Sequence, residues 1–233
     1  MTRKRVTLFT LVLFATFSAR WTKAEDAKTV YPNMAPFEQY LMERDAEIAL
    51  ARSAAPESIA HDAEVQVLGP QGFEIAAKGK NGFVCLVQRS WSAPKNDPDF
   101  WNPKLRSPIC FNPPAARSYL PLTIKRTELI LAKRSEEQMF AALEAAIASK
   151  QLPAPEAGAI GYMMSKQGYL SDRDGRWRPH LMFFAPVTDP ALWGANVSGS
   201  PVFAFKDTSE HRTVFLLPVG KWSDGTDAAD DAH

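Results

Sequence analysis

The sequence predicts an α+β protein, with a mostly antiparallel sheet of about seven strands and two main helices packed on it. Short apolar or alternating runs separated by turn residues lie on both sides of a helical middle. Two segments carry apolar residues at helical spacing. The 233-residue chain is 45% hydrophobic and 23% charged, which is typical of one globular domain. We expect one sheet shared by both halves; two subdomains are the alternative.

Residues 1–24 have the pattern of a secretory signal peptide. A basic start at residues 3–5 precedes an uncharged, mostly apolar run at 6–19. Thr22 and Ala24 place small residues at the cleavage positions. The run is shorter than the roughly 20 apolar residues of a spanning helix. A retained signal anchor is the alternative to cleavage.

Removal of this segment changes the net charge. The whole chain has 27 Lys and Arg against 26 Asp and Glu, and five of the bases lie in the first 24 residues, leaving 22 basic and 26 acidic residues. A mildly acidic protein lacks the basic surface that nucleic-acid binding needs. We expect a secreted or periplasmic protein with one α+β domain at 25–222, no membrane span after signal cleavage, and an acidic, disordered tail at 223–233.

The two cysteines, Cys85 and Cys110, are expected to form a disulfide, because exported chains fold in oxidising compartments. The bond would close a loop of about 25 residues and stabilise the fold by roughly 3.5 kcal/mol on the chain-entropy estimate. A free nucleophilic thiol is the alternative. The apolar neighbours of Cys85 disfavour it, since a reactive thiolate needs a polar or positive environment.

The first expected element is an amphipathic helix at about 36–54, with Pro36 in its first turn and Pro56 after its end. Its polar face is mixed in sign, so we expect it to cover the sheet rather than bind a membrane. Turns rich in glycine then separate three strands. These strands are expected at 64–68, 73–77 and 83–89.

A long segment at 91–121 contains seven prolines, which interrupt regular structure. Its five aromatic residues are too many for a disordered segment. We therefore expect a long ordered loop, pinned to the third strand by the disulfide, whose aromatic side chains cover a face of the sheet. An aromatic wall around a ligand is the alternative.

Residues 122–133 fit either a short helix or a strand. A clear helix begins after Ser135, which fits a capping box with Gln138, and ends before Pro153. The last four strands alternate with two loops, one at 165–179 and one at 188–201. These strands are expected at 160–164, 180–185, 202–205 and 213–219.

The main catalytic candidate is His180, at the start of a strand. A histidine at the rim of a sheet is suited to act as a general base. With Ser165 as nucleophile and either Asp172 or Asp174 to orient the imidazole, it would form a group suited to acyl transfer. No nucleophile-elbow glycines flank Ser165. The alternative is a structural histidine bonded to a backbone carbonyl or a loop carboxylate.

The second candidate is a ligand-binding surface of Arg176, Trp177 and Arg178, joined by Trp193 from the 188–201 loop. Guanidinium groups bind carboxylates, phosphates and anionic glycans. The alternative is a solvated loop in which the arginines pair with neighbouring aspartates.

No metal and no cofactor are expected. Residues 172–175 have the start of a calcium loop, but its twelfth position is Phe183 instead of glutamate, so a hairpin tip is the better explanation. Residues 61–64 and the remaining histidines lack metal-ligand spacing. The chain also lacks the common phosphate-binding, dinucleotide-binding, zinc-protease and nucleophile-elbow motifs.

The sequence therefore predicts an exported binding or envelope-associated protein whose site is built by loops. Loops on a rigid frame carry most binding sites. The three loops are 91–121, 165–179 and 188–201, and the expected ligand is a small molecule or a glycan. A hydrolase that uses His180 with Ser165 for acyl transfer is the alternative.

Overall fold

The computed structural model describes residues 31–228. The expected signal peptide at 1–24 and the end of the expected acidic tail, 229–233, lie outside the described residues. Within the described range, no helix is both long and apolar enough to cross a membrane.

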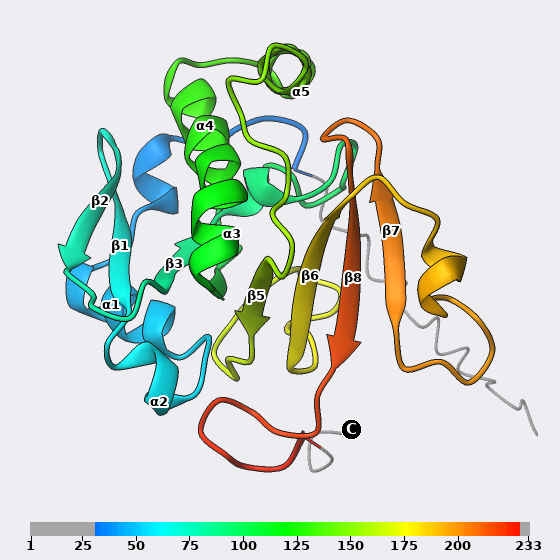
Figure 1. Ribbon diagram of the computed structural model, residues 1–233. Helices are drawn as coiled ribbons and strands as arrows, with labels where there is room; N and C mark the ends of the chain where they lie inside the picture. The colour runs from blue at the N-terminus through cyan, green and yellow to red at the C-terminus, as the bar shows by residue number, and fades with distance from the viewer. Residues whose placement is uncertain (1–30, 229–233) are drawn as a thin grey trace, which may run out of the picture.

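One eight-stranded sheet forms the centre of the protein (Figure 1), in the order β2-β1-β3-β4-β5-β6-β8-β7. Only β1 and β3 pair in parallel among the described strands. The strands are β1 (Glu64–Gly69), β2 (Gly72–Ala77), β3 (Val84–Gln88), β4 (Ser107–Phe111), β5 (Ile160–Met163), β6 (His180–Pro186), β7 (Phe203–Asp207) and β8 (Arg212–Pro218). The prediction of an α+β fold with a mostly antiparallel, shared sheet is confirmed.

The strand β4 was not expected, because Pro108 lies inside it. Cys85 and Cys110 face each other with their Cα atoms 4.0 Å apart, the close spacing of a non-hydrogen-bonded pair. Pro108 lies two residues before Cys110, so it also belongs to a non-hydrogen-bonded pair. Its nitrogen therefore points away from β3, towards the β5 side. There the β4–β5 pairing covers only Cys110 and Phe111. No ladder bond is lost, so the proline is tolerated in a central strand.

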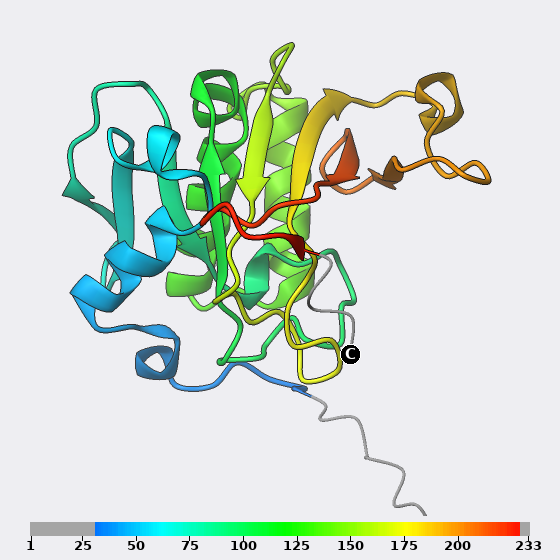
Figure 2. The same cartoon turned by 90° about the horizontal axis from the view of Figure 1, so that it is seen from below.

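Helices cover both faces of the sheet (Figures 1 and 2). Leu50 and Ala51 of α1 pack on one face around the disulfide. Ala115 of α3 and Leu120 of α4 pack on the other face, against Leu86, Ile109 and Phe184. The helices are α1 (Arg44–Arg52), α2 (Glu57–Ala60), α3 (Pro113–Ser118), α4 (Leu120–Leu131) and α5 (Glu136–Ala148), with short 3-10 turns η1 (Phe37–Tyr40), η2 (Ser90–Ser92) and η3 (Pro190–Trp193).

The single helix expected at 36–54 is wrong in its first half. Residues 37–40 form η1, the backbone is extended at Leu41, and α1 starts afresh at Arg44. The Glu43 side chain accepts hydrogen bonds from the backbone N–H groups of Asp45 and Ala46, at 3.1 and 2.9 Å. This capping interaction satisfies free donors of the first turn and sets the start of the helix.

The segment 91–121 is not one long loop. It holds β4, α3 and the start of α4, and the prolines occupy positions that tolerate them. Pro113 and Pro114 lie in the first turn of α3, and Pro121 lies in the first turn of α4. The aromatic side chains of the segment are largely buried, as expected. The ambiguous residues 122–133 belong to α4, and the Ser135–Gln138 capping box of α5 is confirmed.

The start of the expected disordered tail is ordered in the described part of the chain. The Trp222 N–H donates to the Thr226 carbonyl, and the Ser223 N–H donates to the Met164 carbonyl, both at 2.9 Å. The Trp222 side chain is buried. Residues 221–228 therefore form a turn anchored to the end of β5.

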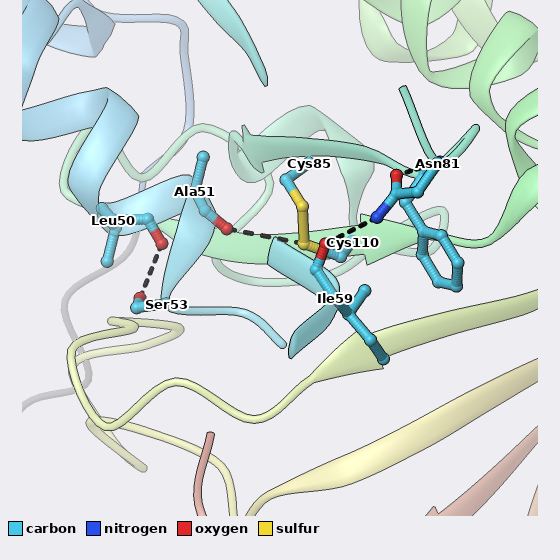
Figure 3. Close-up of a disulfide and its surroundings, with 8 residues drawn as sticks. Leu50, Ala51, Ser53, Ile59, Asn81, Cys85 and Cys110 are labelled. Carbon is cyan, nitrogen blue, oxygen red and sulfur yellow. Dashed lines mark hydrogen bonds between the residues drawn. A yellow bond between two sulfur atoms is a disulfide. The ribbon is translucent and has the colours of Figure 1, made fainter. Parts of the chain in front are cut away.

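The Cys85–Cys110 disulfide joins β3 to β4 directly beneath α1 (Figure 3). Both cysteines are fully buried, and the Cys110 Sγ atom lies 3.8 Å from the Ala51 carbonyl. The bond thus fixes the two central strands at the point where the helix packs on them. A buried disulfide is typical of proteins that fold in an oxidising compartment.

We expect the double change Cys85→Ala with Cys110→Ala to lower the free energy of unfolding by about 3 kcal/mol, because the unfolded chain regains loop entropy. Urea unfolding of the oxidised protein and of the double variant measures this loss. Reduced wild type is the control and is expected to resemble the variant. Equal unfolding midpoints for oxidised and reduced protein would contradict the prediction.

Candidate functional site

A cavity of about 370 Å³ lies on the sheet face that also carries α3 and α4. The strands supply its floor through Gln88, Ser107, Met163, Met182 and Val214. The strand register places these side chains on one face. For example, Met182 is paired with Gly161 and lies two residues before Phe184, so it shares the face of the Phe184–Val214 pair. The walls come from the helix α4, from the segment after β3, from the 165–179 loop, and from β7 with the turn that follows it.

Gln88 and Ser107 of the floor, and Tyr119, which adjoins the floor at the start of α4, have atoms that form no hydrogen bond within the described part of the chain. Gln88, Ser107 and Tyr119 are 7%, 6% and 9% exposed. Gln88 Nε2 donates to Thr123 Oγ1 at 3.3 Å, which leaves its carbonyl oxygen free, and the hydroxyls of Ser107 and Tyr119 have no partner. None of these three atoms is sealed from solvent. Since nearly all buried polar groups are bonded, free groups facing a cavity are suited to a ligand.

The Tyr119 hydroxyl is held in its protonated form. Burial, and next the charge of Glu210, raise the pKa of this hydroxyl above its usual value of 10. The ring stacks on Phe184 at a centroid distance of 3.9 Å, and the guanidinium of Arg212 lies 4.6 Å from the ring centroid, a distance typical of cation–π contacts. Tyr119 is therefore a fixed hydrogen-bond donor at the floor.

The buried side chain of Arg126 joins three walls of the cavity. Its Nε donates to Glu210 Oε1 at 2.7 Å, and its Nη2 donates to the same oxygen. Its Nη1 donates to the carbonyls of Trp91 and Ala93, at 2.6 and 2.9 Å. Arg126 belongs to α4 and Glu210 to the β7–β8 turn, so one guanidinium holds a helix, a turn and the segment after β3 together.

We expect Arg126→Met to lower the free energy of unfolding by about 3 to 5 kcal/mol, because it leaves one oxygen of a buried carboxylate and two carbonyls without their donor. Urea unfolding measures the loss. Arg134→Met, on the exposed turn after α4, is the control and is expected to change little. The double variant Arg126→Met with Glu210→Leu is expected to lose less than the sum of the two single losses, and a purely additive result would contradict this assignment.

The 165–179 loop forms another wall and places Leu170, Ser171 and Trp177 at the cavity. Its tip is a short hairpin, since Leu170 N–H donates to the Gly175 carbonyl at 2.8 Å and Gly175 N–H donates to the Ser171 carbonyl at 2.9 Å. Gly175 has a positive φ of 63°, which glycine adopts at little cost. The turn that the sequence suggested at residues 172–175 is present.

Asp172 fastens this loop to two other segments. It accepts hydrogen bonds from the hydroxyls of Tyr31 and Tyr169, and Lys104 Nζ lies 2.9 Å from its Oδ1. The hydrogen bonds from Tyr169, Tyr31 and Lys104, in that order, lower the pKa of Asp172 to about 2. Asp172 thus links the loop to the N-terminal segment and to the segment before β4.

We expect Asp172→Asn to lower the unfolding temperature near neutral pH and to lose this effect in acid. The folded-state pKa of about 2 lies below the ordinary value of 3.8, so the unfolded chain takes up the proton first. The stabilisation is complete above about pH 4 and declines as the pH falls towards 2. Thermal unfolding of wild type and variant across this range measures it.

The control for this comparison is Glu144→Gln, because Glu144 is exposed on α5 and forms no side-chain hydrogen bond in the described chain. It is expected to follow wild type at every pH. A wild-type advantage over Asp172→Asn that stays constant down to about pH 2 would rule out this role of the carboxylate.

The structure does not assemble the acyl-transfer group considered from the sequence. His180 Nδ1 donates to the Arg178 carbonyl at 2.8 Å, and its Nε2 is buried without a partner in the described chain. Ser165 Oγ is 2.6 Å from Ser53 Oγ and accepts the Gln167 N–H at 3.1 Å. Within residues 31–228, no hydrogen bond joins His180 to Ser165, Asp172 or Asp174.

His180 and Ser165 do line one small hollow of about 20 Å³ beside the main cavity. Burial lowers the pKa of His180 below its usual 6.5, against the opposing effect of its bond to the Arg178 carbonyl. The imidazole is therefore neutral near pH 7, and its ring packs 5.3 Å from that of Trp177. These contacts describe a histidine that supports the wall of the cavity.

The four residues of the predicted ligand surface are separated. Only Trp177 lines the cavity. Arg176 lies 5.3 Å from the ring centroid of Trp222, and Arg178 is exposed. Trp193 belongs to η3, beyond the β7 side of the sheet (Figure 2), and packs on Phe215 at 4.8 Å. Two of the three predicted loops, 91–121 and 165–179, meet at the cavity, and the 188–201 loop does not line it.

Sequence reasoning missed Gln88, Ser107, Tyr119, Arg126 and Glu210. One signal was present, because Arg126 lies on the same helical face as Leu122 and Ile130, and both are buried. A charged residue in an apolar stripe indicates a buried partner. Residues 31–228 contain no group of three side chains that would hold a metal ion.

The chain matches no protein-family model, no curated protein and no solved structure. The case for a function therefore rests on the cavity's own residues.

Proposed function

We propose that this protein is an exported binding protein that holds a small, mostly apolar molecule in the cavity between α4 and the 165–179 loop. The observation that carries the proposal is the free polar groups of Gln88, Ser107 and Tyr119 in a cavity whose exposed surface is mostly apolar. Its volume of about 370 Å³ lies in the range of small-molecule sites.

The side chains indicate how such a molecule would lie. Tyr119 offers a donor, Gln88 an acceptor and Ser107 either, so a hydrogen-bonding group of the ligand fits at the floor. Leu105, Leu170 and the walls around them would contact an apolar body. This arrangement favours a compact apolar molecule over a glycan, which would need polar partners along its whole length.

The signal-peptide pattern at 1–24 and the buried disulfide support a location outside the cytoplasm, in the periplasm or the medium. The acyl-transfer alternative finds less support, because Ser165 and His180 are bonded to different partners. A binding role needs only the rigid, partly enclosed cavity.

Fluorescence titration with dansylamide, a naphthalene with a neutral sulfonamide, tests the proposal. We expect saturable binding, with the sulfonyl oxygens at the Tyr119 hydroxyl. Tyr119→Phe keeps the stacked ring and removes the donor, so the affinity is expected to fall about three- to tenfold.

The matched control is Tyr162→Phe, because Tyr162 lies on the opposite face of the sheet, with the α1 cluster. Its affinity for dansylamide is expected to equal that of wild type. The absence of saturable binding, or equal affinity for Tyr119→Phe and wild type, would overturn the proposal.

A further inference from the structure

We propose that the rim of the cavity selects positively charged ligands, such as a protonated amine carried on an apolar body. The inference rests on the proposed binding function and adds the charge class of the ligand. Two observations support it: where the charged side chains lie in the cavity, and which of them already form an ion pair within the protein.

The rim carries three carboxylates and one guanidinium, from Asp97, Asp99, Asp174 and Arg173. Arg173 Nη2 lies 2.5 Å from Asp174 Oδ2, so the one rim cation is already paired. Asp97 accepts the Asp99 N–H, and Asp99 accepts from Asn102 Nδ2, both at 2.8 Å. Neither Asp97 nor Asp99 forms an ion pair within residues 31–228, so the rim has a net charge of −2.

The buried charges beside the floor cancel. Glu210 pairs with both Arg126 and Arg212, and Asp207 stands opposite Arg212 in the β7–β8 ladder without forming an ion pair in the described chain. The formal charges of these four side chains sum to zero. Arg89 also borders the cavity, and its Nη2 lies 2.8 Å from Glu47 Oε2. An anionic ligand would therefore find no unpaired cation in the cavity and would face the excess carboxylates of the rim.

An ammonium group at the rim would gain two kinds of contact. The carboxylates of Asp97 and Asp99 attract it, and the face of Trp177, which is 46% exposed and lines the same cavity, can hold a cation. The free polar atoms of Gln88, Ser107 and Tyr119 are the separate indication that a ligand belongs there. The ligand would place its hydrogen-bonding group at the floor and carry its charge on a short chain that extends from this group towards the rim.

Three dansyl probes that differ in charge test the inference. They are dansylamide, which is neutral, N-(2-aminoethyl)dansylamide, which carries an ammonium group, and dansylglycine, which carries a carboxylate. In fluorescence titrations at low salt we expect the cationic probe to bind about tenfold tighter than the anionic probe, and added salt to reduce this ratio.

The double variant Asp97→Asn with Asp99→Asn removes both charges and keeps the carbonyl oxygens that accept the local hydrogen bonds. The cation-to-anion ratio is expected to fall close to one. The matched control, Asp45→Asn with Glu144→Gln, changes the net charge equally at exposed sites on α1 and α5. It is expected to keep the wild-type ratio.

Equal binding of the cationic and anionic probes by wild type, or tighter binding of the anion, would overturn the charge selectivity and leave the binding function standing. An equal loss of the ratio in the control variant would also overturn it, because the effect would then come from overall charge. If no probe binds in a way that depends on Tyr119, the proposed function itself fails.

Discussion

The cavity depends on one buried guanidinium. Burying a charge is costly unless its hydrogen-bonding groups are matched, and Arg126 meets this condition by donating to Glu210, Trp91 and Ala93 at once. These partners lie on separate walls, so satisfying the arginine fixes the positions of α4, the β7–β8 turn and the segment after β3 relative to one another. The free atoms of the floor then keep their places without a ligand.

A second buried ion pair supports the cavity from the α1 side. Arg89 donates to the Tyr40 carbonyl at 2.7 Å and to Glu47, and Glu47 accepts the Leu68 N–H at 3.0 Å. Arg89 follows β3, Glu47 lies in α1 and Leu68 in β1, so the pair links a helix to two strands. Fully satisfied buried networks of this kind make the surrounding structure rigid and specific.

The sequence predicted elements whose signal is local and missed contacts that join distant residues. Periodicity and capping identified α5 and most strands. The sequence did not predict β4, because Pro108 fits a central strand only where neither neighbouring strand needs its missing N–H group. The same distinction between local and distant contacts applies to the site. The 165–179 loop drew attention through its charges, but Arg126 and Glu210 meet across 84 positions of sequence, which no local pattern indicates. Of the predicted site residues, Trp177 and Asp174 line the cavity, and Asp174 is paired there with Arg173.

The charges of the 165–179 loop are largely used to hold the loop. Asp172 binds Tyr31, Tyr169 and Lys104, and Arg173 pairs with Asp174. A loop fixed by such contacts loses little conformational entropy when a ligand binds, so more of the contact energy appears as affinity. The charges left for a ligand are then those of the facing segment, Asp97 and Asp99. The net charge that the cavity offers to a ligand therefore depends on which charged side chains already form ion pairs within the protein.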